Sequence, residues 1–213
     1  MTDFNSLTAS QLGDMIGQGK IDPVELTEHF LSQIELSPIG RKIYSTVTFK
    51  LALEQAKDSK KRADAGRRLS SLDGVPISWK DLFDISGYPC EAGSELLAGR
   101  LAIKNAKVYN FAEAHGLICL GKTHMSELAF SGLGLNPSRE TPPCVNYPES
   151  VPGGSSSGAA TSVSFGLAAA GIGSDTGGSV RIPAAWNDLV GFKTTAGKLS
   201  LDGVVPLCSR FDT

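Results

Sequence analysis

Two clusters of glycine and serine, separated by a run of small residues, make up residues 153–181, GGSSSGAATSVSFGLAAAGIGSDTGGSVR. Glycine loses more conformational freedom on folding than any other residue, so ordering the glycines of both clusters is costly. Glycine is also the residue that lets a backbone approach a ligand closely. The segment therefore predicts loops that present serine hydroxyls and bare backbone N–H groups to one small site.

The spacing of the two clusters predicts that they meet in space. Residues 156–170 are rich in alanine and poor in charge, which favours a buried helix about 22 Å long. Residues 169–176 then form a short buried strand in this prediction, which returns about 23 Å. Because the two lengths nearly cancel, we expect Ser155 and Ser179 at the same end of a sheet, close enough to share a proton network.

Composition and charge exclude several classes of protein. A net charge of −2 with mixed signs gives no electrostatic reason to expect a nucleic acid or an anionic membrane as partner. The amino-terminal MTDFNSLTAS has no apolar core of a signal peptide, and no apolar stretch is long enough to span a bilayer. The expectation is a cytoplasmic protein, and 213 residues that are 41% hydrophobic can bury one sizeable core.

The cysteines give no sign of a metal site. They lack C-x-x-C spacing and have no histidine pattern nearby, which argues against zinc and favours free thiols in a reducing compartment. The four are Cys90, Cys119, Cys144 and Cys208.

Helix signals dominate the first 66 residues. Thr8 is suited to cap a short helix over the ASQLGDMIGQG that follows it. Asp22 and Pro23 open a second helix, because an aspartate cap followed by proline is a typical helix start. A third helix is predicted from Phe49 to about Ala65, ending at Gly66.

Beyond residue 66 the pattern changes to alternating strands and helices. Val75 to Lys80 is predicted as a strand, residues 104–115 as a helix, and residues 116–123 as a buried strand. This alternation through residue 190 predicts an α/β fold in which helices cover both faces of a sheet. Residues 131–153, rich in Gly, Pro, Asn and Ser, predict a long loop leading into the first serine cluster.

A serine hydroxyl becomes a good nucleophile only when a base removes its proton. All three histidines precede both serine clusters, and the prolines of NYPESVPG make a poor strand before Gly154, which argues against an α/β-hydrolase elbow. No lysine has a serine three residues before it, and neither cluster continues into a phosphate-binding Gly-Lys-Ser. Lys80, at the end of an apolar strand, is the prominent remaining base, because burial would lower its pKa toward neutrality.

Three separated blocks, GVPISWKDLFD, PGGSSSGAA and GSDTGGSVRIPAA, resemble in order and interval the signature of the amidase signature family. The resemblance implies a mixed β-sheet covered by helices on both faces. It also implies that residues 1–213 form a single but incomplete amidase signature domain, corresponding to about the first half of that domain. Within it, residues 1–66 would be N-terminal helices and residues 67–213 the first part of the catalytic core.

The same resemblance implies a catalytic triad. Carried over position by position, Lys80 is the base, Ser155 is the bridging serine on a cis peptide bond, and Ser179 is the nucleophile. The oxyanion hole would consist of the backbone N–H groups of Thr176, Gly177 and Gly178. A glycine pair before the nucleophile agrees with this role, since its N–H groups are not shielded by side chains.

Further roles implied by the resemblance are supporting ones. Asp175 and Arg181 would orient the nucleophile loop or form a structural ion pair, and Ser131 would lie in a substrate-lining loop. The chemistry needs no metal and no cofactor. A homodimer is an expectation from the family alone.

The function implied is hydrolysis of the C–N bond of a small-molecule carboxamide through a serine acyl-enzyme. One alternative is the amidase (A) subunit of a glutamyl-tRNA(Gln) or aspartyl-tRNA(Asn) amidotransferase, which releases ammonia from glutamine for a partner. A truncated, non-catalytic module is the other alternative.

Overall fold

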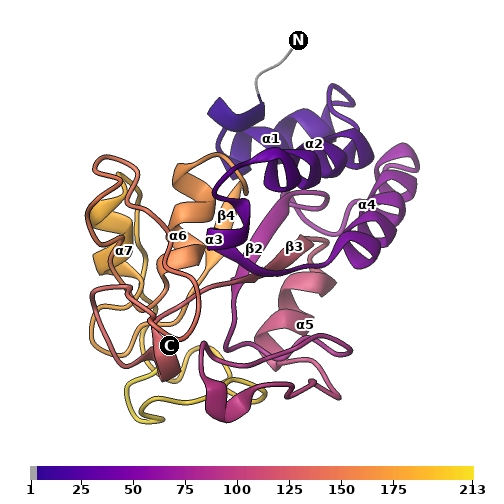
Figure 1. The fold of residues 1–213 in the computed structure, drawn as a ribbon. Coiled ribbons are helices and arrows are strands. Elements are labelled where there is room, and N and C mark those ends of the chain that lie inside the picture. Colours follow the sequence, from indigo (N-terminus) through magenta and orange to yellow (C-terminus); the bar gives the residue numbers. More distant parts are fainter. Residues whose placement is uncertain (1–3) are drawn as a thin grey trace.

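A four-stranded mixed sheet in the order β1-β3-β2-β4 lies at the centre of the computed structural model, which describes residues 4–213 (Figure 1). Strand β1 runs antiparallel to β3, whereas β3, β2 and β4 are parallel. The strands are β1 (Tyr44–Val47), β2 (Pro76–Lys80), β3 (Ile118–Thr123) and β4 (Ala170–Ile172). The predicted α/β class with a mixed sheet is confirmed.

The amino-terminal helices begin where their capping residues predict. In α1 (Ala9–Gly17), the Thr8 side chain accepts from the backbone of Gln11, whose own side chain reaches back to Thr8. In α2 (Pro23–Leu36), Asp22 accepts from the backbone of Val24. Helix α4 (Phe49–Asp64) ends one residue before the predicted limit. These caps satisfy N–H groups that the helices themselves leave unpaired.

Shorter elements connect this framework. The helices are α3 (Gly40–Ile43), α5 (Lys107–Ala114), α6 (Ser157–Ser164) and α7 (Arg181–Trp186), with 3₁₀ turns η1 (Phe4–Ser6), η2 (Glu95–Leu97) and η3 (Glu127–Ala129). Helix α5 begins three residues later than predicted, and β2 and β3 lie within the predicted ranges. Residues 131–153 form the predicted long loop without a helix or strand.

Helices cover both faces of β2. On one face, Ser78 Oγ lies 2.7 Å from Ser162 Oγ of α6. On the other, the Trp79 ring packs against Tyr109 of α5, with ring centroids 5.2 Å apart. Because successive strand residues point to opposite faces, Lys80 shares the α6 face with Ser78. Figure 1 shows α6 and α5 on opposite sides of the central strands.

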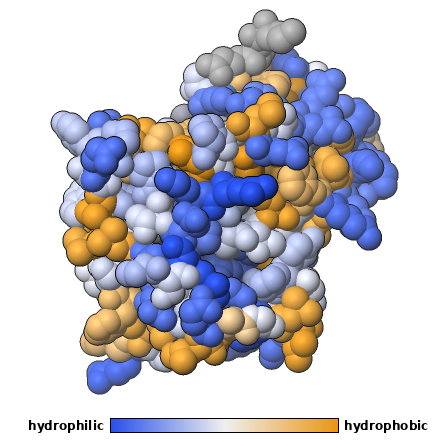
Figure 2. Space-filling view, viewed as in Figure 1, coloured by the Kyte–Doolittle hydropathy of each residue, from blue (hydrophilic) through white to orange (hydrophobic). Residues whose placement is uncertain are grey.

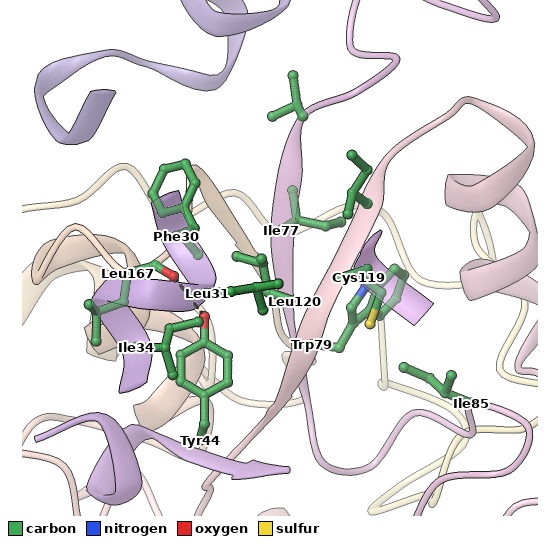
Figure 3. Packing of buried hydrophobic residues seen from close by; sticks show 14 of the residues in the cluster. Phe30, Leu31, Ile34, Tyr44, Ile77, Trp79, Ile85, Cys119, Leu120 and Leu167 are labelled. Atoms are coloured by element: carbon green, nitrogen blue, oxygen red, sulfur yellow. Dashed lines mark hydrogen bonds between the residues drawn. The ribbon is translucent and has the colours of Figure 1, made fainter. Parts of the chain in front are cut away.

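The hydrophobic core fills the space on both sides of β2 and β3. Figure 3 shows Tyr44 and Leu167 on one side of these strands, where the Tyr44 hydroxyl donates to the Leu167 carbonyl at 2.9 Å. Trp79 and Cys119 lie on the other side (Figure 3). Burying both faces of β2 leaves its end, and therefore Lys80, without contact with water.

The helix and the strand between the serine clusters are both shorter than predicted. The predicted helix over residues 156–170 is wrong in extent, since α6 covers eight residues and β4 only three. Gly166 adopts a left-handed conformation with φ +67°, which ends the helical path. Helix α6 is about 12 Å long and strand β4 about 10 Å. Because these lengths still nearly cancel, the chain returns to the end of the sheet where the first serine cluster lies.

Hydrophilic side chains gather on the surface around α4, at the upper right of Figure 2. Within residues 4–213, no helix combines the length and the apolar character needed to cross a bilayer. All four cysteines carry free thiols, as the sequence predicted.

Replacing Gly158 with alanine should destabilise the fold. A Cβ there would lie 2.7 Å from the carbonyl oxygens of His124 and Ile43, which are backbone atoms that cannot rotate away. We expect Gly158→Ala to lower the free energy of unfolding by about 1–3 kcal/mol in urea denaturation. Gly17→Ala in α1 is the control, since its Cβ would meet only the flexible end of Arg68. Equal stability of the two variants would contradict this packing.

Candidate active site

Lys80 places an amine at the carboxyl end of β2, fully buried among the serine-rich segments. Its Nζ lies 2.8 Å from Ser155 Oγ and 2.8 Å from Ser174 Oγ. Within residues 4–213, no carboxylate lies within 4.0 Å of this Nζ. Burial lowers the pKa of Lys80 to about 7, although the charges of Asp175 and Asp212 act in the opposite direction. The amine is therefore available as a neutral base near physiological pH.

Ser155 is held by backbone contacts on both sides. It follows a cis peptide bond from Gly154, and its carbonyl accepts from the N–H of Ser126 at 3.2 Å. Gly154 donates to the Gly132 carbonyl at 2.8 Å. A Cβ on Gly154 would lie 2.5 Å from the backbone nitrogen of Gly134, so only glycine fits between the two loops. The long loop thereby fixes the position of the first serine cluster.

The two serine clusters meet, as their spacing predicted. The N–H of Ser156 donates to the carbonyl of Ser179 at 3.1 Å. Ser156 Oγ also accepts from the Ser174 N–H at 3.3 Å and donates to the Ser174 carbonyl at 3.2 Å. In the described chain, no hydrogen bond joins the Oγ atoms of Ser155 and Ser179 directly. The structure thus brings the backbones of the two serine clusters together.

Asp175 organises the turn that carries Ser179. Its carboxylate is bound bidentately by Arg181, at 2.9 and 3.0 Å, and accepts from the N–H of Gly178 at 2.7 Å and of Val180 at 3.1 Å. Burial would raise the pKa of Asp175, but hydrogen bonds from Arg181 and from three backbone N–H groups lower it to about 2. Asp175 and Arg181 therefore form an ion pair that stabilises the loop.

The Asp175 carboxylate accepts a hydrogen bond from one of the backbone N–H groups that were expected in the oxyanion hole. The Gly178 N–H, which the sequence placed toward a reacting carbonyl, donates to Asp175 instead. Gly177 differs, because a Cβ on it would meet no heavy atom of the described chain within 4 Å. The backbone at Gly177 therefore borders open space, and Thr176 and Gly177 remain the candidate donors.

Ser131, expected in a substrate-lining loop, lies close to the first serine cluster. Its hydroxyl accepts from Leu133 N–H at 3.1 Å, and its carbonyl accepts from Ser126 Oγ at 3.2 Å. Ser126 in turn contacts Ser155 through its backbone. The structure thus gives Ser131 a turn-forming role next to the site.

Sequence reasoning missed Ser174 and the importance of Ser156. Ser174 supplies the second hydroxyl on Lys80, and Ser156 ties the two clusters together. Ser174 directly precedes Asp175 in the third signature block, which is the one signal that could have identified it.

A second buried lysine, Lys122 of β3, contrasts with Lys80. Its Nζ lies 2.8 Å from Asp81 Oδ1 and donates to the Pro89 carbonyl at 3.0 Å. Lys122 aligns with Trp79 across the two strands, so it points to the face opposite to Lys80. Asp81, next to Lys80 in sequence, is therefore engaged by Lys122.

An apolar groove lies between α6, β4 and α7, beside β4, which is an edge strand of the sheet within residues 4–213. It touches the serine clusters only through Ser156, and Lys80, Ser155 and Ser179 are not among the residues that line it.

A model of the family described as Amidase matches residues 25–213. The chain belongs to the amidase family. The resemblance in the three signature blocks is therefore confirmed.

Two curated relatives are subunits of an amidotransferase. The chain is 38% identical to the A subunit of glutamyl-tRNA(Gln) amidotransferase from Acinetobacter baylyi, over all of this chain and 43% of that protein. It is also 38% identical to the mitochondrial form of this subunit from Anopheles gambiae, over 97% of this chain and 43% of that protein. The chain thus spans less than half the length of these relatives.

Solved structures of amidases share the fold closely. The peptide amidase of Stenotrophomonas maltophilia is 29% identical, with a TM-score of 0.92 over 99% of this chain and 45% of that one. An amidase family protein from Bacillus anthracis is 29% identical, with a TM-score of 0.88 over 98% of this chain and 43% of that one. The present chain is thus an amidase-family protein in sequence and in fold.

The lowered pKa of Lys80 should make stability depend on pH. The folded chain loses the Lys80 proton near pH 7, whereas an unfolded lysine keeps it to about pH 10.4. Between these values the unfolded state binds more protons, so stability contributed at Lys80 rises with pH, by at most about 1.4 kcal/mol per pH unit. Urea denaturation of the wild type and Lys80→Met from pH 7 to 10 measures this. A stability difference independent of pH would contradict a neutral Lys80.

Proposed function

We propose that this chain carries the base, relay and nucleophile of an amide hydrolase that cleaves a carboxamide C–N bond through a serine acyl-enzyme. The observation that supports this most is the buried Lys80 amine, which has no carboxylate partner within residues 4–213 and lies 2.8 Å from Ser155 Oγ. A buried lysine near neutral pH can accept a proton, which an ion-paired lysine cannot do. The N–H of Ser156, the residue after Ser155, donates to the Ser179 carbonyl at 3.1 Å.

In the proposed reaction, neutral Lys80 accepts the proton of Ser155, and Ser155 accepts that of Ser179. A hydroxyl can relay a proton because it is both donor and acceptor. Ser179 Oγ attacks the carbonyl carbon, and the electron pair of the C=O bond moves to the oxygen. The Thr176 and Gly177 N–H groups stabilise this oxyanion, where one such donor typically contributes about 3 kcal/mol.

Collapse of this intermediate breaks the C–N bond. The proton held by Lys80 returns through Ser155 to the leaving nitrogen, and the acyl group stays on Ser179. Water then attacks the acyl-enzyme by the same relay and releases the carboxylic acid. Because the base must be neutral, the rate is expected to fall as pH drops below about 7.

The remaining features of the proposal concern context. Asp175 and Arg181 act by holding the nucleophile loop, and the substrate is a small-molecule amide. The four free thiols fit a reducing compartment such as the cytoplasm.

A second candidate function is that of an amidotransferase component. It is favoured by the 38% identity to the A subunit of glutamyl-tRNA(Gln) amidotransferase. In that role the same triad would cleave the side-chain amide of glutamine, and the ammonia released would pass to a partner protein. The two candidates share the chemistry at Ser179 and differ in substrate and partner.

Labelling with a fluorophosphonate probe tests the nucleophile. We expect the wild-type chain to take one label at Ser179 and Ser179→Ala to take none, with mass spectrometry locating the adduct. Ser157→Ala is the control, since this serine lies in the first cluster and its hydroxyl donates to the carbonyl of His124, at 3.4 Å. A folded wild-type chain without label, or a labelled Ser179→Ala, would falsify the proposal.

Ammonia release from glutamine separates the two candidates. The amidotransferase role predicts glutaminase activity that rises when the other subunits of such an enzyme are added, whereas a free-standing amidase hydrolyses simple carboxamides without them. A coupled ammonia assay with both substrates, with and without added subunits, measures this. Ser179→Ala is the background control. Glutaminase activity that is absent, or that added subunits leave unchanged, would exclude the amidotransferase role.

A further inference from the structure

The last thirteen residues contact both the segment that follows Lys80 and the loop that carries Ser179. This segment, residues 201–213, is here called the C-terminal brace. Near its start, the N–H of Val205 donates to the Leu82 carbonyl at 2.9 Å, and the Gly203 carbonyl accepts from Asp84 at 2.9 Å. Both contacts lie just beyond Lys80. At its end, Thr213 exchanges two hydrogen bonds with Asp175, at 3.0 and 3.2 Å. The brace thus spans from the base to the nucleophile loop.

Asp212, next to the end of this brace, is buried. One of its carboxylate oxygens accepts a hydrogen bond from the Thr176 hydroxyl. The carboxylate also accepts from the N–H groups of Leu207, at 3.0 Å, and Cys208, at 2.9 Å. No lysine or arginine of residues 4–213 lies within 4.0 Å of it. Buried carboxylates normally pair with a cation, so one held by a hydroxyl and backbone donors marks a special position.

We propose that Asp212 is a positioning residue for the reaction: by holding the Thr176 hydroxyl, it orients the Thr176–Gly177 backbone beside Ser179. This inference rests on the proposed function. Thr176 is fixed on one side by Asp212, while Asp175, the residue before it, is fixed by Thr213. A Cβ on Gly177 would meet no described residue within 4 Å other than its two chain neighbours, so no side-chain packing restrains that side of the turn. Asp212 adds a restraint at Thr176, while Asp175 holds the Gly178 N–H.

The charge of Asp212 also acts on Lys80. The charged groups that act on the amine are Asp175 of the nucleophile loop and Asp212 of the brace, since Asp81 is bound by Lys122. Both negative charges favour the protonated amine, against the effect of burial. Loss of the Asp212 charge therefore moves the acid limb of the rate to lower pH, an effect that a purely structural residue would not have.

The test compares four variants by their rate of fluorophosphonate labelling at Ser179 between pH 5 and 9. Asp212→Asn and Thr176→Val should lower the plateau rate about tenfold or more, because small errors in geometry are costly at a reacting centre. Thr176→Ser, which keeps the hydroxyl, should restore most of the rate. Asp202→Asn is the matched control, because this brace aspartate is exposed and pairs with Lys107 at the surface.

Only Asp212→Asn should also move the acid limb to lower pH. A plateau rate like that of the wild type in Asp212→Asn, or an equal loss in Asp202→Asn, overturns the proposal. Should Asp212→Asn fail to fold, Thr176→Val and Thr176→Ser decide it, since the hydroxyl alone should account for the difference.

A second measurement separates this inference from the proposed function. Hydrogen exchange at the amides of residues 176–179 should be faster in Asp212→Asn and Thr176→Val than in Asp202→Asn, whether or not Ser179 reacts. A wild-type chain without label but with this exchange pattern refutes the nucleophile and retains Asp212 as the restraint on the loop. Unchanged exchange in both variants refutes the restraint itself.

Discussion

The site depends on one constraint, the burial of the Lys80 amine without a carboxylate partner among the described residues. Both faces of β2 are covered, so its last side chain ends among serines instead of water. Desolvation disfavours the charged amine, and the two hydroxyls that contact it suit a neutral group as well as a charged one. The nearest acidic residue in sequence, Asp81, is turned away and neutralised by Lys122. The fold thus gives Lys122 a carboxylate partner and leaves Lys80 without one among the described residues.

Local signals in the sequence were sufficient for the framework. Caps at Thr8 and Asp22 act within a few residues, so the positions of α1 and α2 follow from the sequence alone. The buried runs of β2 and β3 were equally clear. The antiparallel strand Tyr44–Val47 was missed, because its place is decided by pairing with β3, which is distant in sequence. The helix after Ser156 was predicted too long, since Gly166 outweighed the alanines around it.

In the candidate site, too, some residues were identified from local sequence patterns and others only from the tertiary structure. The signature blocks identified Lys80, Ser155 and Ser179, which the structure brings to one place, while their roles remain predictions. The engagement of Gly178 by Asp175 could not be foreseen, because it depends on the orientation of a single peptide. Asp212 lies 36 residues beyond Thr176 and carries no motif, so only the path of the chain reveals it. Contacts of this kind are set by tertiary structure and leave no local pattern.

Gly154 and Gly177 differ in how closely the surrounding chain packs against them. At Gly154 a methyl group would collide with neighbouring backbone, so the fold itself requires glycine there. At Gly177 the surrounding chain would accept a side chain without a collision. Packing among the described residues therefore does not require glycine at this position. In the proposed reaction, the carbonyl group of the substrate would approach Ser179 from this open side.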